Sequence, residues 1–244
     1  MKSAIYKSIT EQSSKGKKQF AVLIDPDKIS SESMIRSAEK AGVDLLLVGG
    51  SLLTNGNFEE CIQFLKKNTQ IPIVIFPGNG HQISSSADAI LLLSLISGRN
   101  PDLLIGNHVI AAPMIKSSQL EVISTGYMLI ESGRQTSALY MSNTNPIPSD
   151  KDDIAMCTAM AGEMLGLKMI YMDAGSGALN PVSETMIRTV KNNVHIPVMV
   201  GGGIKTVEQA VASCKAGADI IVVGNAIEKD PGLIKKISDS IHQL

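Results

Sequence analysis

Eight short aliphatic runs recur along the chain, and segments with helical spacing separate them. The runs cover residues 20–24, 45–48, 73–76, 89–95, 122–130, 169–172, 198–200 and 220–223. Several are apolar throughout, which is typical of parallel strands covered on both faces. Apolar residues follow a helical period at 33–41, 58–67, 153–165, 207–216 and 233–241. This alternation predicts an α/β fold built from repeated strand–helix units.

Eight such units in 244 residues match the usual size of a (β/α)8 barrel, here a single domain over residues 1–244. A doubly wound open sheet is the alternative. Glycines follow most of the predicted strands, as expected where loops meet at one rim, and this favours the barrel. Residues 1–17 are expected to form a short helix that closes the barrel floor, and 132–150 a mobile lid over the site.

The overall charge excludes a polybasic nucleic-acid binder, because 22 Lys and Arg face 23 Asp and Glu. Aromatic residues make up 3% of the chain, with no Trp, so platforms for stacking bases are scarce. The N-terminal 20 residues lack an apolar signal core, and the most apolar run, 89–96, is too short to span a bilayer. We therefore expect a cytoplasmic protein. Its cysteines, Cys61, Cys157 and Cys214, are predicted to be reduced core thiols.

Two glycine-rich segments indicate a phosphate site after the seventh and eighth strands. They are VGGGI, with Gly202 and Gly203, and VVGNAI, with Gly224 and Asn225. Glycine lets the backbone approach a phosphate closely, and its free N–H groups can donate to phosphate oxygens. The simpler interpretation is that these glycines only relieve crowding at the rim.

The sixth strand ends in YMDAGSG, which combines a carboxylate with a hydroxyl and two glycines. Tyr171 and Ser176 are candidates to bind a small polar ligand there. Asp173 would take a proton from a ligand hydroxyl or hold that hydroxyl in place. A local Asx or Ser cap is the structural alternative.

At the end of the first strand, IDPDK places Asp25, Asp27 and Lys28 on the same rim. Mg²⁺ is commonly held by one or two carboxylates and by substrate phosphates, so Asp25 is a candidate ligand. The Ser51 hydroxyl, after the second strand, would face the same ion. Asp27 is better explained as a cap for a helix that begins near Ser30.

The motifs IDPDK, VGGSLLT, YMDAGSG, VGGGI and VVGNAI, spread in order over nearly the whole chain, resemble those of the geranylgeranylglyceryl phosphate synthase family and its heptaprenyl relative. The resemblance implies a (β/α)8 prenyltransferase. Such an enzyme joins the C3 hydroxyl of sn-glycerol 1-phosphate to a polyprenyl diphosphate, geranylgeranyl diphosphate in particular, with Mg²⁺ and release of pyrophosphate. It also implies a homo-oligomer, for which the Met-rich segment 156–164 offers an apolar face.

The resemblance assigns the metal to Asp25 and Ser51 and the catalytic carboxylates to Asp173 and Asp25. It assigns glycerol phosphate to Tyr171, Met172, Asp173, Ala174, Gly175, Ser176, Gly177, Gly202, Gly203, Gly224 and Asn225. The family usually has Glu where this chain has Asp173, one methylene shorter, so a base and an orienting group both stay open. It further implies that residues 124–127 face the substrate, and Arg134 is then a candidate for a bidentate phosphate contact.

Several other residues have weaker claims to the site. Lys28 and Arg99 are possible diphosphate partners, and their simpler interpretation is surface charge. His81 and His108 are first interpreted as structural histidines, whereas Ser124, Tyr127 and Glu131, around the fifth strand, are better placed. The Gly- and Ser-rich segment 78–87 leaves room for an apolar channel along the barrel flank.

Two other classes of function remain open. One is another phosphate-binding barrel enzyme, an isomerase or lyase, whose loops after strands seven and eight would look alike. The other is a barrel that binds a phosphorylated metabolite without catalysis.

Overall fold

The structure, a computed structural model of the chain, describes residues 4–28, 31–55 and 57–244. Eight parallel strands run through it: β1 (Gln19–Ile24), β2 (Leu45–Val48), β3 (Ile73–Ile75), β4 (Ala89–Leu95), β5 (Glu121–Leu129), β6 (Met169–Asp173), β7 (Val198–Gly201) and β8 (Ile220–Val223). Each strand pairs with the next, and β8 pairs with β1, so the sheet closes into a barrel. The (β/α)8 barrel is confirmed, and the open sheet is excluded.

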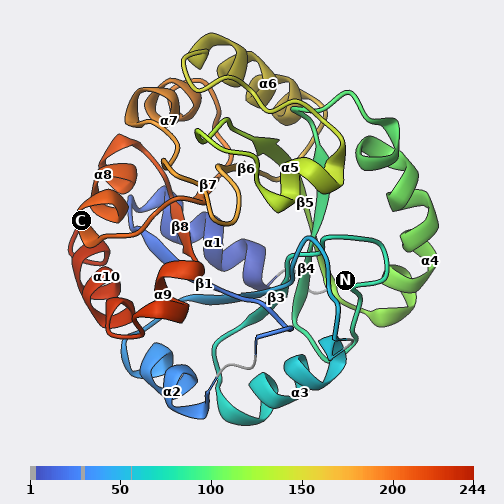
Figure 1. Ribbon diagram of the computed structural model, residues 1–244, viewed down its shortest axis with the longest axis vertical. Helices are drawn as coiled ribbons and strands as arrows, with labels where there is room; N and C mark the ends of the chain where they lie inside the picture. The colour runs from blue at the N-terminus through green and yellow to red at the C-terminus, as the bar shows by residue number, and fades with distance from the viewer. Residues whose placement is uncertain (1–3, 29–30, 56) are drawn as a thin grey trace.

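Helices form a ring around this barrel (Figure 1). In chain order the described helices are α1 (Ala4–Ser14), α2 (Glu32–Lys40), α3 (Phe58–Asn68), the π-helix η1 (Asp102–Gly106), α4 (Asn107–Ser118), α5 (Ser137–Ser142), α6 (Asp152–Met164), α7 (Glu184–Lys191), α8 (Val207–Ala216), α9 (Asn225–Lys229) and α10 (Leu233–Ile241). Helix α1 is not part of the ring and lies behind the barrel in this view. Among the described residues, no helix is long and apolar enough to cross a membrane.

Side chains alternate between the barrel interior and the layer under the helices, as the period of a strand requires. On β4, Leu91 and Leu93 belong to the interior cluster, whereas Ile90 and Leu92 pack in the outer layer. Leu92 also lines the cleft described below. Leu93 lines the cleft as well, so both faces of the strand contribute to the wall of the site.

Helix α1 closes the amino-terminal end of the barrel, as predicted for this segment, although residues 1–3 lie outside the described ones. Its buried Ile9 packs with the interior cluster. The Glu121 carboxylate, at the start of β5, accepts hydrogen bonds from the Ile5 and Tyr6 amides at 2.9 and 2.7 Å. Ser13 donates to Asp219, just before β8, at 2.8 Å. The floor is therefore sealed, and the opposite end is free to form a site.

Two local predictions are wrong. Asp27 does not cap α2: Ser31 does, accepting from the Met34 amide, while Ser30 lies outside the described residues. Of the three free cysteines only Cys214 is buried, and Cys157 is exposed. Cys157 lies on α6, whose buried face is formed by small residues, so the thiol is on the side away from the core.

Candidate active site

A cleft of about 540 Å³ opens at the carboxyl ends of the strands. The polar part of its wall comes from the loops after β1, β2, β6, β7 and β8. Its apolar part comes from the flank between β3, β4 and α4. The apolar lining includes Ile83, Ile90, Leu92, Leu103, Ala111 and Ile115. One continuous cavity thus joins a polar end to an apolar groove.

Asp173 ends β6 at the base of the polar part. Its carboxylate accepts a hydrogen bond from the Tyr127 hydroxyl at 2.6 Å and from the Gly175 amide at 2.7 Å. Burial raises the pKa of the Asp173 carboxyl, and these two hydrogen bonds oppose the rise. Burial and the nearby Asp173 charge hold the pKa of Tyr127 well above its ordinary value, so this phenol stays a donor.

Tyr171 stands beside this pair and is almost fully buried. Its ring lies 5.5 Å from that of Tyr127 and 5.2 Å from that of Phe76, so three aromatic rings pack together under the cleft. Burial raises the pKa of the Tyr171 hydroxyl well above its ordinary value. Tyr127 therefore holds the Asp173 side chain through its hydroxyl, Tyr171 packs beside it, and both tyrosines remain neutral.

The loop after β7 requires glycine for two reasons. Gly202 and Gly203 have φ angles of +78° and +70°, a region that L side chains rarely adopt. A Cβ at Gly202 would lie 2.4 Å from the Gly175 nitrogen, and one at Gly203 would lie 2.4 Å from the Asn180 oxygen. Within the described residues the amides of Gly202 and Gly203 donate to no protein acceptor. They are therefore available to an anion.

The loops after β6 and β8 meet at the other side of the same pocket. The Ser176 hydroxyl donates to Asn225 Oδ1 at 3.2 Å, and Gly224 precedes the short helix α9. Gly175 and Gly177 line the cleft with these residues.

Two members of the predicted glycerol phosphate set do not line the cleft. Met172 and Ala174 are buried in the layer between sheet and helices.

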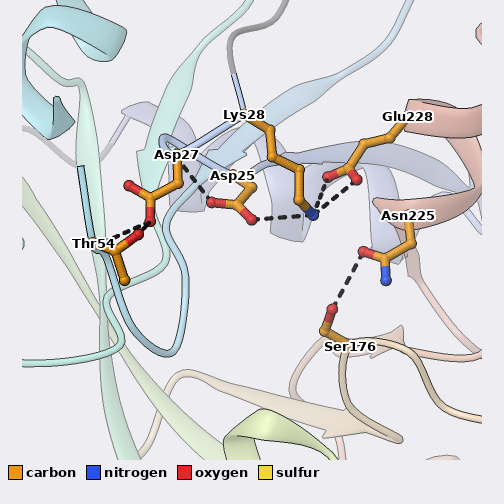
Figure 2. Close-up of polar contacts among 7 residues, drawn as sticks. All are labelled: Asp25, Asp27, Lys28, Thr54, Ser176, Asn225 and Glu228. Atoms are coloured by element: carbon orange, nitrogen blue, oxygen red, sulfur yellow. Dashed lines mark hydrogen bonds and ion pairs between the residues drawn. The ribbon is translucent and has the colours of Figure 1, made fainter. Parts of the chain in front are cut away.

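Asp25 follows β1 on the same rim, next to the loop after β8, and lines the cleft. Figure 2 shows its carboxylate between Asp27 and Lys28. Its Oδ1 accepts from the Asp27 amide at 3.1 Å, and its Oδ2 lies 3.2 Å from the Lys28 ammonium. The neighbouring loop after β2 is close, since a Cβ at Gly50 would lie 3.6 Å from Asp25 Oδ1. Ser51 follows on that loop and also lines the cleft.

Asp27 points away from Asp25 and holds the loop after β2. Its carboxylate accepts from the Thr54 amide and hydroxyl at 2.6 and 2.8 Å and from the Asn55 amide at 3.1 Å. The hydrogen bond from the Thr54 amide is the main cause that lowers the pKa of Asp27. Asp27 therefore organises the rim, and Asp25 remains the carboxylate that faces the cavity.

Of the other candidate residues from the sequence, some line the cleft and some do not. Tyr127 and His108 line the cleft, whereas Ser124, Glu131, Arg134, His81 and Arg99 do not. His108 lies on the apolar flank, with Nε2 3.4 Å from the Ser94 hydroxyl.

Glu228 was not found from the sequence. It lines the cleft from α9, one helical turn after Asn225. The three-residue spacing between Asn225 and Glu228, which places both on one face of a helix, was the signal available in the sequence.

Comparison with known proteins identifies the family. The sequence profile of the PcrB family matches residues 12–242. The chain belongs to the PcrB family. A relative from Chitinophaga pinensis, named geranylgeranylglyceryl phosphate synthase, is 57% identical over 99% of this chain and 97% of its own. The resemblance read from the motifs is therefore confirmed.

Solved structures agree with this placement in the PcrB family. The crystal structure of (S)-3-O-geranylgeranylglyceryl phosphate synthase from Thermoplasma acidophilum, in complex with its substrate sn-glycerol-1-phosphate, superposes with a TM-score of 0.91. It is 32% identical, and the match covers 98% of both chains. Thiamine phosphate pyrophosphorylase from Pyrococcus furiosus superposes with a TM-score of 0.59 at 14% identity, over 92% of this chain and 96% of its own, and shares the fold alone.

Proposed function

We propose that this protein is a geranylgeranylglyceryl phosphate synthase. It joins the C3 hydroxyl of sn-glycerol 1-phosphate to geranylgeranyl diphosphate, forms an ether bond and releases pyrophosphate. The observation that carries this proposal is the cleft, in which a buried carboxylate and a glycine loop with amides unpaired within the described residues lie at one end of an apolar groove. The match to a relative crystallised with sn-glycerol-1-phosphate supports it.

Glycerol phosphate would bind with its phosphate at the loops after β7 and β8. The free amides of Gly202 and Gly203 would donate to the phosphate oxygens, and Ser176 and Asn225 add polar side chains beside them. With the phosphate held there, the glycerol chain extends toward Asp173 at the end of β6. This orientation presents the C3 hydroxyl to the carboxylate.

Asp173 would act on that hydroxyl. Its two known partners, the Tyr127 hydroxyl and the Gly175 amide, orient the carboxylate. A raised pKa makes it a stronger base than an exposed aspartate. The carboxylate takes the hydroxyl proton as the C3 oxygen attacks, or it orients the hydroxyl while the proton leaves through water. In either case the oxygen bonds to C1 of the prenyl chain, and the bond from C1 to the diphosphate breaks.

The prenyl chain would occupy the apolar flank. Pro77, Gly78 and Gly80 leave space beside β4, and Leu92, Ala111 and Ile115 form the wall. An apolar groove excludes water from an allylic cation, which otherwise reacts with it. Within the segment 78–87, Gly78, Asn79, Gly80 and Ile83 line the cleft, which supports a channel there.

Magnesium would be held at Asp25 and Ser51. The donors there are oxygens, which suit Mg²⁺, and within the described residues no three acidic, His or Cys side chains gather as a complete metal site. One carboxylate and one hydroxyl fit an ion whose remaining ligands are water and diphosphate oxygens. When bound, Mg²⁺ would offset the charge that develops on the leaving diphosphate. Asp25 and Ser51 would position the diphosphate between the two ends of the cleft.

Two further expectations belong to this proposal. Homo-oligomer formation would use the apolar side chains that α6 and the residue after it expose, including Ile154, Met164 and Leu165. Light scattering of the purified chain tests it. The cytoplasmic location remains a prediction.

The test is product formation with the substrates supplied separately and together. Pyrophosphate release is expected only when sn-glycerol 1-phosphate, a prenyl diphosphate and Mg²⁺ are all present. Mass spectra of the products from diphosphates of increasing length identify the ether and the preferred chain. Pyrophosphate release without glycerol phosphate, or no ether product with any diphosphate, would reject the proposal in favour of another phosphate-binding barrel.

A further inference from the structure

Lys28 bridges two acidic residues across the rim of the cleft (Figure 2). Its ammonium lies 3.2 Å from Asp25 Oδ2 and 2.9 and 3.3 Å from the two carboxylate oxygens of Glu228. Asp25 follows β1, and Glu228 lies on α9 after β8. The bridge therefore spans 200 residues of sequence, and it exists because β8 pairs with β1.

This ion pair places an ammonium beside the carboxylate that a metal ion would need. Asp25 Oδ1 accepts from the Asp27 amide, and Oδ2 lies 3.2 Å from the Lys28 ammonium, so each carboxylate oxygen already has one partner. A divalent cation can bind there only if the ammonium moves away, because two positive charges would otherwise be neighbours.

The backbone of Lys28 is hydrogen-bonded within the turn after β1, whereas its side chain is partly exposed. The Lys28 amide donates to the Asp25 carbonyl at 3.0 Å. The turn is tied to the next loop through Asp27 and Thr54. The Lys28 side chain itself is 54% exposed. Its four-carbon stem lets the ammonium reach into the cleft without any change in the barrel.

We propose that Lys28 is a resident counter-ion that makes metal binding at Asp25 depend on the diphosphate. This inference rests on the proposed function, since it assumes the metal at Asp25. In the ligand-free protein, Lys28 neutralises Asp25 and Glu228. When a diphosphate enters, its oxygens give the ammonium a new anionic partner, Lys28 leaves Asp25, and the metal takes its place. Glu228 is the positioning residue that holds Lys28 at the rim.

The proposal predicts how the two ligands are coupled. Because binding is reciprocal, a diphosphate that draws Lys28 away from Asp25 must tighten metal binding by the same factor as the metal tightens diphosphate binding. Removing the ammonium should strengthen metal binding in the absence of diphosphate. It should also reduce the extra affinity that diphosphate provides. A residue that merely stabilised the rim would not produce the first effect.

The experiment measures Mn²⁺ binding to the full chain by electron paramagnetic resonance, with and without inorganic pyrophosphate. Lys28→Met should bind Mn²⁺ about 1.4- to 5-fold more tightly than the wild type without pyrophosphate, the range set by one partly exposed ion pair. Lys28→Arg should resemble the wild type. The matched control is Lys66→Met, which removes another partly exposed ammonium, paired with Asp88 at 2.8 Å and outside the cleft lining.

The outcomes separate this inference from the proposed function. If Lys28→Met binds Mn²⁺ no more tightly than the wild type, while Asp25→Asn loses the binding seen with pyrophosphate, the counter-ion role is wrong and the metal role of Asp25 stands. If Asp25→Asn binds Mn²⁺ as the wild type does, the metal lies elsewhere, and the counter-ion role of Lys28 and the metal role of Asp25 are both wrong. If Lys66→Met tightens Mn²⁺ as much as Lys28→Met, the effect is general charge, and the inference is overturned.

Discussion

Replacing Asp173 with Asn tests the chemistry of the site most directly. The amide has the same shape, and it can still accept from the Gly175 amide and face the Tyr127 hydroxyl, which lie 2.7 and 2.6 Å from the carboxylate. What disappears is the negative charge. Because the phosphate is held by the loops after β7 and β8, the KM for glycerol 1-phosphate should change by less than about threefold.

The expected loss in kcat distinguishes the two roles left open for Asp173. If the carboxylate takes the hydroxyl proton, kcat should fall by about 10²- to 10⁴-fold. If it only orients the hydroxyl, the loss is one charged hydrogen bond, about 1.5–3 kcal/mol, or roughly 10- to 150-fold. Tyr127→Phe is the comparison, since it keeps the charge and removes one of the groups that position it.

Stability provides the control for this variant. Burial raises the folded-state pKa of Asp173 above its unfolded value, so ionisation of this group opposes folding at neutral pH. As pH falls from the raised folded pKa toward the unfolded one, the wild type should regain this stability. The neutral Asp173→Asn protein should not show that change, and at neutral pH its Tm should equal or exceed that of the wild type.

Steady-state kinetics and thermal unfolding together show whether Asp173 acts in the chemical step, in substrate binding or in stability. In the wild type, kcat should also fall as acid protonates Asp173, starting above the ordinary carboxyl pKa. An Asp173→Asn protein whose KM rises as much as its kcat falls would refute the reasoning and leave Asp173 a binding group. A large fall in Tm would show that the charge is structural.

Three further predictions concern the cradle, the metal and the barrel exterior. Gly42→Ala, at φ +75° with no neighbour within 4 Å, should lower the free energy of unfolding in urea by about 1–2 kcal/mol. Gly202→Ala, whose Cβ meets backbone, should lower it more and also raise the KM for glycerol 1-phosphate. Equal losses of stability in the two variants would contradict this. Asp25→Ala should abolish the calorimetric coupling of Mg²⁺ and prenyl diphosphate yet spare glycerol 1-phosphate binding, and full activity would place the metal elsewhere. A hydrogen bond with Asp44 is the main cause that raises the pKa of His242, so its stabilisation is complete below about pH 6.5 and is lost as pH rises through the higher folded pKa. The Tm advantage over His242→Gln should shrink across that range, and a constant difference would exclude the link.

The surroundings of Gly202 change what a substitution in the loop after β7 can show. From sequence, a side chain at Gly202 is expected to fill the space of a phosphate oxygen and leave the fold intact. The structure shows that the Cβ would instead meet the backbone of the loop after β6, 2.7 Å from Asp173 Oδ1. The loss of phosphate binding would then come with displacement of Asp173.

The sequence alone was sufficient for the eight strands and for the loops that gather at their carboxyl ends. Each apolar run is long enough for one strand, and burial of both faces of a parallel sheet requires such runs, so the strands fall within about one residue of their predicted bounds. Helix α7 was missed although Ser183 and the spacing of Met186, Ile187 and Val190 marked it. Helix α4 contains Pro113 and exposes Val109 and Ile110, so its pattern does not indicate an amphipathic helix.

Tertiary structure alone decided which polar groups act together. Tyr127 and Asp173 are 46 residues apart and bond because β5 pairs with β6 in register. Lys28 reaches Glu228 only because the barrel closes. Sequence patterns report the period of burial within each element. The contacts between elements depend on register and closure, which are properties of the folded sheet.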